Sequence, residues 1–380
     1  MGDWFSIGTD GQPYIGTFNG DGHTISGHSD EHGLFDNVGS GGTVKNLTVS
    51  GTVTGDYYVG GIVNENSGTI QNCAFSGSVS GTGGGRKVGG IVGWNKNGGT
   101  VTDCRNTGNI SGSANDGAAY VGGVVGENSG TVTNSYNTGK VSGSSSDYVG
   151  GVVGDNSGRV VNSYNTGAVS GSKNVGGVVG YNYSGGNVTN CYNTGSVSDG
   201  TYTGGVVGYN ISASVANCYY QQHDPAIFGI GDTTKDDTRT VAKTADKFHS
   251  GEVAYLLGEA WGQNLMNEPK DNYPQLRAFD ADTPQVYKVA FMNDSEEHDA
   301  KYANSGMTVD LPATEPTKEG YTFSYWQDKA GTQVTEPISV NSDTTYYAKW
   351  PPKATPSPSR SHQTKPTSSM TSVSPRMARR

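Results

Sequence analysis

Leucine and proline are nearly absent from the middle of this 380-residue chain. All seven leucines lie outside residues 48–255, and no proline occurs between Pro13 and Pro225. The apolar residues of this stretch are mostly valine, isoleucine, tyrosine and alanine, which favour strands over helices. A strand that pairs on both edges needs every backbone N–H, so the absence of proline agrees with central strands. The composition therefore excludes a leucine-rich helical fold and favours an all-β fold.

Basic residues and long apolar runs are also scarce. The chain has 25 basic and 35 acidic residues, and six of the basic ones lie in the last 30 positions, which contain no acid. The rest of the chain is therefore strongly acidic, which argues against a nucleic-acid partner. No stretch approaches the ~18 apolar residues of a membrane span, and the first residues lack the basic and apolar segments of a signal peptide. We expect no membrane span, and the signal for any export is missing from this sequence.

Glycine is abundant, with 59 residues, and it marks an internal repeat. A Gly-Gly pair followed by Val or Ile and then Val recurs six times, at intervals of 26–33 residues. A unit this short cannot bury its apolar face alone, whereas stacked copies bury a continuous valine column. The repeat predicts a right-handed parallel β-helix over residues 1–218, with three strands and three corners per turn. The pairs begin at Gly60, Gly89, Gly122, Gly150, Gly176 and Gly204.

Asparagine recurs at equivalent positions of the aligned repeats. Asparagine tolerates the left-handed backbone of a corner, and its amide can bond the copies above and below, so we interpret these columns as structural ladders. The columns are Asn66, Asn95, Asn128, Asn156, Asn182 and Asn210; Asn72, Asp103, Asn134, Asn162, Asn190 and Asn217; and Asn106, Asn137, Asn165 and Asn193.

The four cysteines lack the CxxC spacing of a metal or redox site and are too few for a disulfide scaffold. They share one column of the repeat with two serines, which suggests a small packed side chain. Neighbouring turns would also place Cys73 near Cys104, and Cys191 near Cys218, within disulfide range, so both states stay open. The column is Cys73, Cys104, Ser135, Ser163, Cys191 and Cys218.

The repeat resembles a known family. VGGIVGWN (residues 88–95), VGGVVGENSGTVTNSYNTGKVSG (121–143) and VGGVVGYN (175–182) are similar to the GLUG repeat of bacterial surface and secreted proteins. The likeness covers about residues 50–220, and residues 16–51 resemble the opening turns of bacterial surface β-helices. The first unit departs from the pattern, with Asn64 in place of the usual glycine, as a capping turn would. The resemblance implies a cell-envelope or extracellular location.

The second half of the chain has a different pattern. Residues 219–285 are expected to form a partly helical cap and connector, with Thr244 as a helix N-cap and breaks at Gly251 and Gly258. We expect this segment to cover the last open turn of the β-helix. Residues 286–350 resemble the Listeria-Bacteroides repeat, which implies a small, separate β-grasp-like module. Residues 351–380 are rich in proline, serine and threonine and are expected to be a disordered linker.

Motifs that carry catalysis do not occur in the sequence. It contains no HExxH, no GxSxG and no GxxxxGK[ST], so we predict no catalytic residue, metal or cofactor. Glu65, Glu127 and Asp155 share one column, but Trp94 separates the first two, and we interpret the column as solvated acids. Metal binding at the clustered His23, His28 and His32 is the weaker interpretation, because short loops collect such residues without needing a ligand.

Two columns of aromatic residues are the candidate binding site. Stacked rings ~5 Å apart form a flat platform for sugar rings if they face outward, and they are core packing if they face inward. The Gly-Gly-Val-Val sequence gives no clean alternation that would decide the direction. The columns are Tyr136, Tyr164, Tyr192 and Tyr219, and Trp94, Tyr181 and Tyr209.

These observations favour a non-enzymatic bacterial surface module that acts as a spacer with an adhesive face. Its expected partners are glycans or host and matrix proteins, and we expect a monomeric module of a larger surface protein. The first alternative is a carbohydrate-active β-helix enzyme, a polysaccharide lyase or hydrolase, which needs convergent carboxylates. The second alternative is a non-catalytic part of a larger secreted peptidase, because some proteins with GLUG-like repeats are zinc peptidases.

Overall fold

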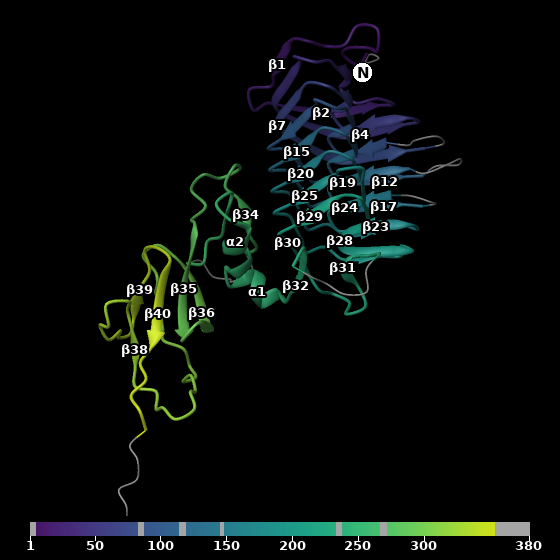
Figure 1. Cartoon of the computed structure of the whole chain (residues 1–380). Helices are drawn as coiled ribbons and strands as arrows, with labels where there is room; N and C mark the ends of the chain where they lie inside the picture. The colour runs from purple at the N-terminus through teal and green to yellow at the C-terminus, as the bar shows by residue number, and fades with distance from the viewer. Residues whose placement is uncertain are drawn as a thin grey trace, which may run out of the picture. The chain divides into compact units, whose positions relative to one another are not determined.

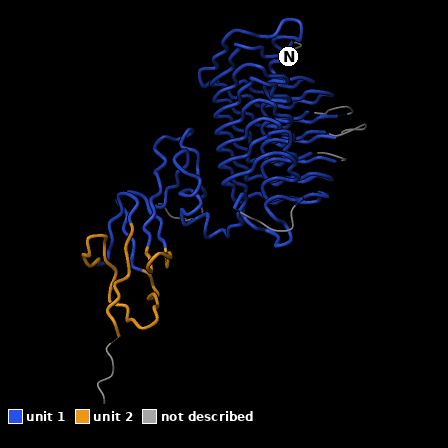
Figure 2. The backbone as a smooth tube through the Cα atoms, in the orientation of Figure 1, with its two compact units in different colours: residues 1–290, 300–311, 335–344 blue, residues 291–299, 312–334, 345–380 orange. Residues whose placement is uncertain are grey.

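The computed structural model describes residues 5–82, 87–113, 119–144, 148–232, 238–266 and 272–353. It divides into two compact units (Figure 2). Unit 1 contains residues 1–290, 300–311 and 335–344, and unit 2 contains residues 291–299, 312–334 and 345–380. The described residues are almost entirely strands and turns, as the composition predicts.

Unit 1 contains a parallel β-solenoid in which each repeat makes one turn, as Figure 1 shows. Its first sheet has 19 strands, all paired in parallel. Its first strands are β1 (Thr17–Asn19), β2 (Thr24–Asp30), β4 (Thr43–Gly55) and β7 (Thr69–Gly81), of which β4 and β7 have 13 residues each. Three ladders of short strands then follow. The first ladder consists of β10 (Thr100–Thr102), β15 (Thr131–Thr133), β20 (Arg159–Val161), β25 (Asn187–Thr189) and β29 (Ser214–Ala216), and the second of β11 (Arg105–Asn106), β16 (Tyr136–Asn137), β21 (Tyr164–Asn165), β26 (Tyr192–Asn193), β30 (Cys218–Gln221) and β32 (Thr240–Lys243). The third ladder consists of β12 (Asn109–Gly112), β17 (Val141–Gly143), β22 (Val169–Ser170) and β27 (Val197–Ser198).

The second sheet of the solenoid has 13 strands in two ladders, which β28 (Tyr202–Ile211) joins. One ladder ends in the repeated Val-Gly, and the other begins at the second valine after the Gly-Gly pair. The first ladder consists of β5 (Tyr58–Gly60), β8 (Lys87–Gly89), β13 (Tyr120–Gly122), β18 (Tyr148–Gly150) and β23 (Asn174–Gly176). The second ladder consists of β3 (Phe35–Val38), β6 (Val63–Asn66), β9 (Val92–Asn95), β14 (Val125–Asn128), β19 (Val153–Asn156) and β24 (Val179–Tyr183). The last strand of the sheet, β31 (Phe228–Ile230), pairs with β28.

A complete turn therefore has five short strands, not the three expected, because two kinds of residue interrupt the segments. The Gly-Gly pair bends the chain between β13 and β14. A side chain on Gly122 would collide with the Val125 carbonyl oxygen, and one on Gly123 would collide with the Asn137 side chain. The left-handed asparagine column makes the second break, since Asn134 has a φ of 47° between β15 and β16. The repeated glycines and asparagines thus mark bends inside the predicted segments.

Asparagine ladders run along the solenoid as the sequence predicts. In the column of Asn66 each amide nitrogen donates to the amide oxygen of the next turn, over 2.7–2.8 Å. The column of Asn106 has the same direction and distances. In the left-handed column the amides instead donate toward the N-terminal turn, as from Asn162 to Asn134. These contacts satisfy buried amides between turns and fix the register of each turn on the next.

Valine side chains fill the solenoid between the two sheets. The four cysteines are free and buried among them, so the mixed column of cysteine and serine consists of small packed side chains. Asn64, which stands where later turns have glycine, accepts bonds from the Gly33 and Gly60 N–H groups and donates to Asp36. It thereby satisfies polar groups of its own turn and of the preceding one, which β3 forms, and the capping role stays a prediction.

The parallel pairing continues beyond residue 218, where the sequence analysis ended the solenoid. Residues 218–221 of β30 pair with residues 240–243 of β32. Two short helices follow, α1 (Ala245–His249) and α2 (Glu252–Leu257), and then the antiparallel strands β33 (Trp261–Gly262) and β34 (Gln275–Leu276). Thr244 is the N-cap of α1, and Gly251 and Gly258 bound α2, as predicted.

The C-terminal region has strands but no helix among residues 286–353. The β-grasp-like arrangement therefore stays a prediction. The unit boundary also differs from the predicted domain boundary at residue 286, because Asn304 ties the end of β36 to the connector through Gln263, Leu265 and Gln285. The strands of this region are β35 (Val286–Asn293), β36 (Glu296–Asn304), β37 (Thr308–Val309), β38 (Trp326–Gln327), β39 (Ile338–Ser339) and β40 (Thr344–Ala348). Four of them form a sheet in the order β36-β35-β40-β38, and β37 pairs with β39. The predicted linker lies outside the described residues from residue 354 onward.

We expect Asn165→Ala to lower the free energy of unfolding by about 3 kcal/mol, because it leaves the Gly167 N–H and the Asn193 Oδ1 without their ladder partner in the interior and removes one of the two acceptors of the Asn137 amide. Asn162→Gly is the matched control. It keeps a residue that accepts the left-handed backbone at a half-buried corner, so its loss should stay below ~1 kcal/mol. Chemical denaturation measures both, and equal losses would contradict a structural role of the buried ladder.

Candidate ligand-binding face

The tyrosine column of Tyr136, Tyr164 and Tyr192 lies on the side of its sheet that faces away from the valine core. Its rings are stacked, with centroids 4.7 Å and 4.9 Å apart and planes within 12° of parallel. The fourth member, Tyr219, is also buried. The column is therefore outside the solenoid core, which the sequence alone left undecided.

Residues 245–266 and 272–279 contain the side chains that cover this column. Trp261 packs on Tyr164 and Tyr192 at 5.8 Å and 5.3 Å between ring centroids, and Phe279 packs edge-on to Tyr136 at 4.8 Å. The Tyr192 hydroxyl donates to the Pro274 carbonyl oxygen over 2.6 Å, and Tyr192 is 1% exposed. The segment predicted to cap the last turn thus lies along the tyrosine column over several turns. Tyr192 is thus enclosed, whereas Tyr136 and Tyr164 stay half-buried beneath Trp261 and Phe279.

The other aromatic column lies in register with the acidic one, on the second sheet. Strand pairing aligns Glu65 with Trp94, then Glu127, Asp155, Tyr181 and Tyr209. A parallel column on the neighbouring ladder consists of Tyr58, Lys87, Tyr120, Tyr148, Asn174 and Tyr202. We call these two columns, together with Tyr183, the aromatic-acidic face.

Rings of the two columns contact one another at the C-terminal end of this face. Tyr120 and Tyr148 are stacked at 5.3 Å, Tyr148 contacts Tyr181 at 4.8 Å, and Tyr181 stacks on Tyr183 at 5.1 Å. Most of these rings are half-buried, and Tyr202 is 37% exposed. The rings therefore form one connected row that is partly open to solvent.

Lysines fill the spaces between rings and acids at the N-terminal end. The Lys87 ammonium lies 3.3 Å from the centre of the Trp94 ring and 3.1 Å from Glu127 Oε2. Lys96 pairs with Glu65 and lies 4.8 Å from the same tryptophan ring. Burial lowers the pKa of Lys87, although the Glu127 carboxylate opposes this change. Each of these two acids thus has its own cation.

Asp155 pairs with no cation among the described residues. It is 3% exposed, and no group in the described part of the chain hydrogen-bonds its Oδ1. Burial, and after it the charge of Glu127, raise its pKa to about 8, while Lys87 acts in the opposite direction. Burial thus favours the protonated form of Asp155 in the unliganded chain.

Asp155 and Glu127 are two carboxyl groups on adjacent strands, of which Glu127 pairs with Lys87 and Asp155 has a raised pKa. A protonated acid beside an ionised one is the pattern of acid-base catalysis at a glycosidic bond. Here, however, Lys87 holds the Glu127 carboxylate, which weakens it as a base or nucleophile. The sequence analysis had interpreted this column as solvated acids, and the burial of Asp155 contradicts that interpretation.

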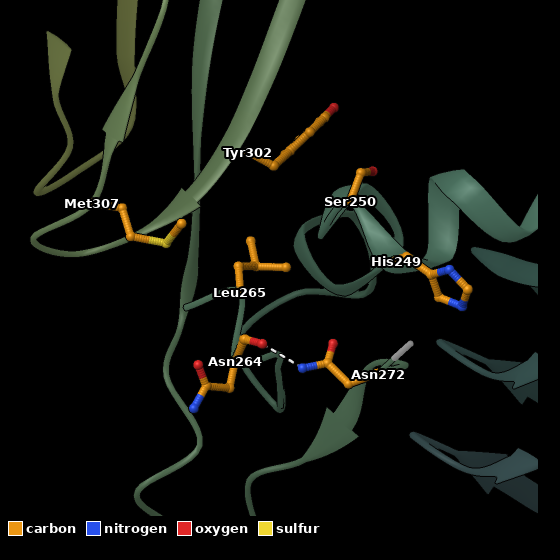
Figure 3. Close-up of a pocket in the computed structure, with 7 residues that line it drawn as sticks. All are labelled: His249, Ser250, Asn264, Leu265, Asn272, Tyr302 and Met307. Carbon is orange, nitrogen blue, oxygen red and sulfur yellow. Dashed lines mark hydrogen bonds between the residues drawn. The ribbon is translucent and has the colours of Figure 1, made fainter. Parts of the chain in front are cut away.

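Two hollows of unit 1 are further candidate sites. One, of about 570 Å³, adjoins the aromatic-acidic face and is lined by Asp10, Glu31, Asp36, Asp56 and Glu65 among others. The other, in Figure 3, has a volume of about 170 Å³, below the roughly 300–1,000 Å³ of usual ligand pockets. Its polar lining comes from His249, Ser250, Asn264, Asn272 and Tyr302, and it contains no carboxyl group.

The histidine cluster of the first turns does not form a metal site. The buried His28 ring bonds the His32 carbonyl oxygen through Nε2. Among the described residues, no three histidine, cysteine or acidic side chains lie close enough to hold a metal ion. No helix of the described chain is long and apolar enough to cross a membrane.

The sequence analysis missed five aromatic residues of the face. Four of them stand two positions before the Gly-Gly pair, so the repeat alignment contains a signal that would have found them. The fifth, Tyr183, occurs in one repeat only and had no such signal. They are Tyr58, Tyr120, Tyr148, Tyr202 and Tyr183.

Comparisons with known proteins agree with the two resemblances. Residues 84–111, 117–142 and 171–198 match the GLUG motif, and residues 287–349 match the Listeria-Bacteroides repeat domain. A stretch of 89 residues is 42% identical to halomucin of Haloquadratum walsbyi; it covers 22% of this chain and 1% of halomucin. No solved structure matches the chain significantly. The chain is thus a repeat protein that carries GLUG motifs in its solenoid and a Listeria-Bacteroides repeat in its C-terminal region.

Tyr164→Ala should lower the free energy of unfolding by about 3 kcal/mol, because it opens a cavity between Tyr136, Tyr192 and Trp261. Tyr181→Ala is the control on the partly open face and should cost about 1 kcal/mol. Thermal or chemical denaturation compares the two variants. A loss for Tyr164→Ala no larger than that of the control would show that the covering segment does not hold this ring.

Asp155→Asn should raise the free energy of unfolding at neutral and alkaline pH. The folded chain keeps a proton on Asp155 up to about pH 8, whereas the unfolded chain releases it near the ordinary value of 3.8. Wild-type stability therefore falls as the pH rises between these two values, and the asparagine variant lacks this fall. Denaturation across this range tests it, with Asp103→Asn as a control that removes the same charge elsewhere. Parallel curves for wild type and Asp155→Asn would refute the burial of this acid.

Proposed function

We propose that this chain is a non-enzymatic module of a cell-surface protein, and that its aromatic-acidic face binds glycans. The observation that carries the proposal is the connected, partly open row of rings from Tyr120 to Tyr209. The GLUG motifs, the Listeria-Bacteroides repeat and the likeness to halomucin support a place in the cell envelope. In this proposal the module is monomeric and part of a larger surface protein.

The solenoid favours a polymer as ligand. Valine fills the space between the sheets, so the binding surface is a side of the solenoid on which similar groups recur at each turn, ~4.8 Å apart. Each stacked ring contributes only ~1 kcal/mol, so a single sugar binds weakly and a chain that contacts several turns binds more tightly. The proposed surface leaves out the tyrosine column on which Phe248, Trp261 and Phe279 pack.

A second candidate function is cleavage of a polysaccharide, which the Asp155 and Glu127 pair favours. A lyase or hydrolase would use the protonated Asp155 as acid and Glu127 as base. A search for newly formed reducing ends or unsaturated products on diverse glycans tests this candidate. Turnover that Asp155→Asn and Glu127→Gln both abolish would establish an enzyme and contradict the binding module.

The binding proposal predicts that Tyr181→Ala combined with Tyr209→Ala weakens glycan binding about thirtyfold, because two stacking rings of ~1 kcal/mol each are lost. A glycan and matrix-protein array with the full chain identifies the ligand class, and titration calorimetry measures the affinity. Tyr321→Ala, an exposed tyrosine of the C-terminal region, is the control and should leave binding unchanged. Binding only to matrix proteins, or a glycan affinity that the double variant does not change, would contradict the proposed site.

A further inference from the structure

Within the aromatic-acidic face, one acid is held by an internal cation and another is not. The Lys87 ammonium contacts Glu127 of the next turn while it lies over the Trp94 ring. One turn further on, the place equivalent to Lys87 is taken by Tyr120, and the place of Glu127 by Asp155. Asp155 therefore occupies the position that Glu127 has one turn earlier, with a tyrosine where Glu127 has its lysine partner.

Aromatic rings surround this unpaired acid. Burial is the main cause of the raised pKa values of Tyr120, Tyr148 and Tyr183, and the negative charge of Asp155 is the second cause in each case. All three tyrosine hydroxyls therefore lie close enough to Asp155 to interact with its charge. Asn174, in the following turn of the same face, is 3% exposed and also has an unpartnered acceptor, Oδ1. An ammonium group fits beside a carboxylate among tyrosine rings, and a sugar hydroxyl fits a free amide oxygen.

We propose that the aromatic-acidic face binds a cationic glycan, a polymer of hexosamine units with free amino groups, and that one ammonium group binds beside Asp155 as Lys87 binds beside Glu127. This inference rests on the proposed glycan-binding function and specifies its ligand class. The rings contact the apolar faces of the sugars, and Asp155 selects the positive charge.

The acidic hollow at the N-terminal end of the face supports a ligand with several charges. It adjoins Tyr58 and Glu65, and four further carboxyl groups line it, from Asp10, Glu31, Asp36 and Asp56. A chain that lies along the turns from Asp155 toward this hollow meets negative charge at both places. A neutral glycan gains nothing from these acids, so the face discriminates by charge.

The pH dependence of binding follows from Asp155. The unliganded acid has a pKa of about 8, and a cation binds its ionised form better, so affinity for a permanently charged ligand rises as the pH passes this value. Charged and titratable groups of the neighbouring strands and loops also face this region. They are Lys87 of β8, Tyr120 of β13, Glu127 of β14, Tyr148 of β18, Tyr181 and Tyr183 of β24, and Lys173 over the Tyr148 ring.

The test titrates the full chain with two oligosaccharides of equal length, N-trimethylglucosamine and N-acetylglucosamine oligomers. The first keeps its positive charge at every pH, and the second is neutral. Above pH 8 we expect the cationic oligomer to bind at least about tenfold more tightly, with an advantage that shrinks as the pH falls below 8. Asp155→Asn should remove the pH dependence and most of the advantage, whereas Asp103→Asn, with the same change in net charge, should keep both.

Each outcome decides one point. Equal affinity for the two oligomers overturns the cationic ligand but leaves glycan binding intact, whereas no binding of either overturns both. Equally tight binding of an oligolysine with the same number of charges overturns the assignment to a glycan. The wild-type pH profile tests the role of Asp155 without any variant, and an unchanged melting temperature or a higher one shows that Asp155→Asn is folded.

Discussion

The buried hydrogen bond from one asparagine amide to the next fixes the register of the solenoid turns from Asn66 to Asn210. The columns of Asn66 and Asn106 bond in one direction along the chain, and the left-handed column bonds in the other. A slip of one residue would break both buried ladders at once and leave amides unsatisfied in the interior. Because the register is fixed, the side chains on the outer surface also form straight columns, and the candidate site consists of two of these.

The Gly-Gly pair brings those two columns together. The chain bends there so closely that neither glycine has room for a side chain. The bend places the ladder that starts with Tyr58 beside the ladder that contains Trp94, so that rings and charges of neighbouring turns contact one another. The glycines that reveal the repeat in the sequence therefore also make the binding face.

Tyrosine has two different roles in the same repeat, and its surroundings decide between them. Tyr192 and Tyr181 come from the same unit, yet Tyr192 is covered by Trp261 and Phe248, whereas Tyr181 lies among the partly open rings. The covering residues lie more than 50 positions further along the chain. Their packing converts one of the two predicted aromatic columns into a structural contact.

The sequence by itself determined the parallel solenoid, its period and the asparagine ladders, because each repeat interacts mainly with its copies and the pattern records those contacts directly. It also determined the breaks at Gly251 and Gly258, which are local properties of the chain. Tertiary structure alone decided which aromatic column is covered, because that depends on a distant segment that does not repeat. It also decided that Asp155 is buried without a cation, since this depends on which side chain the neighbouring turn places beside it, a lysine for Glu127 and a tyrosine for Asp155.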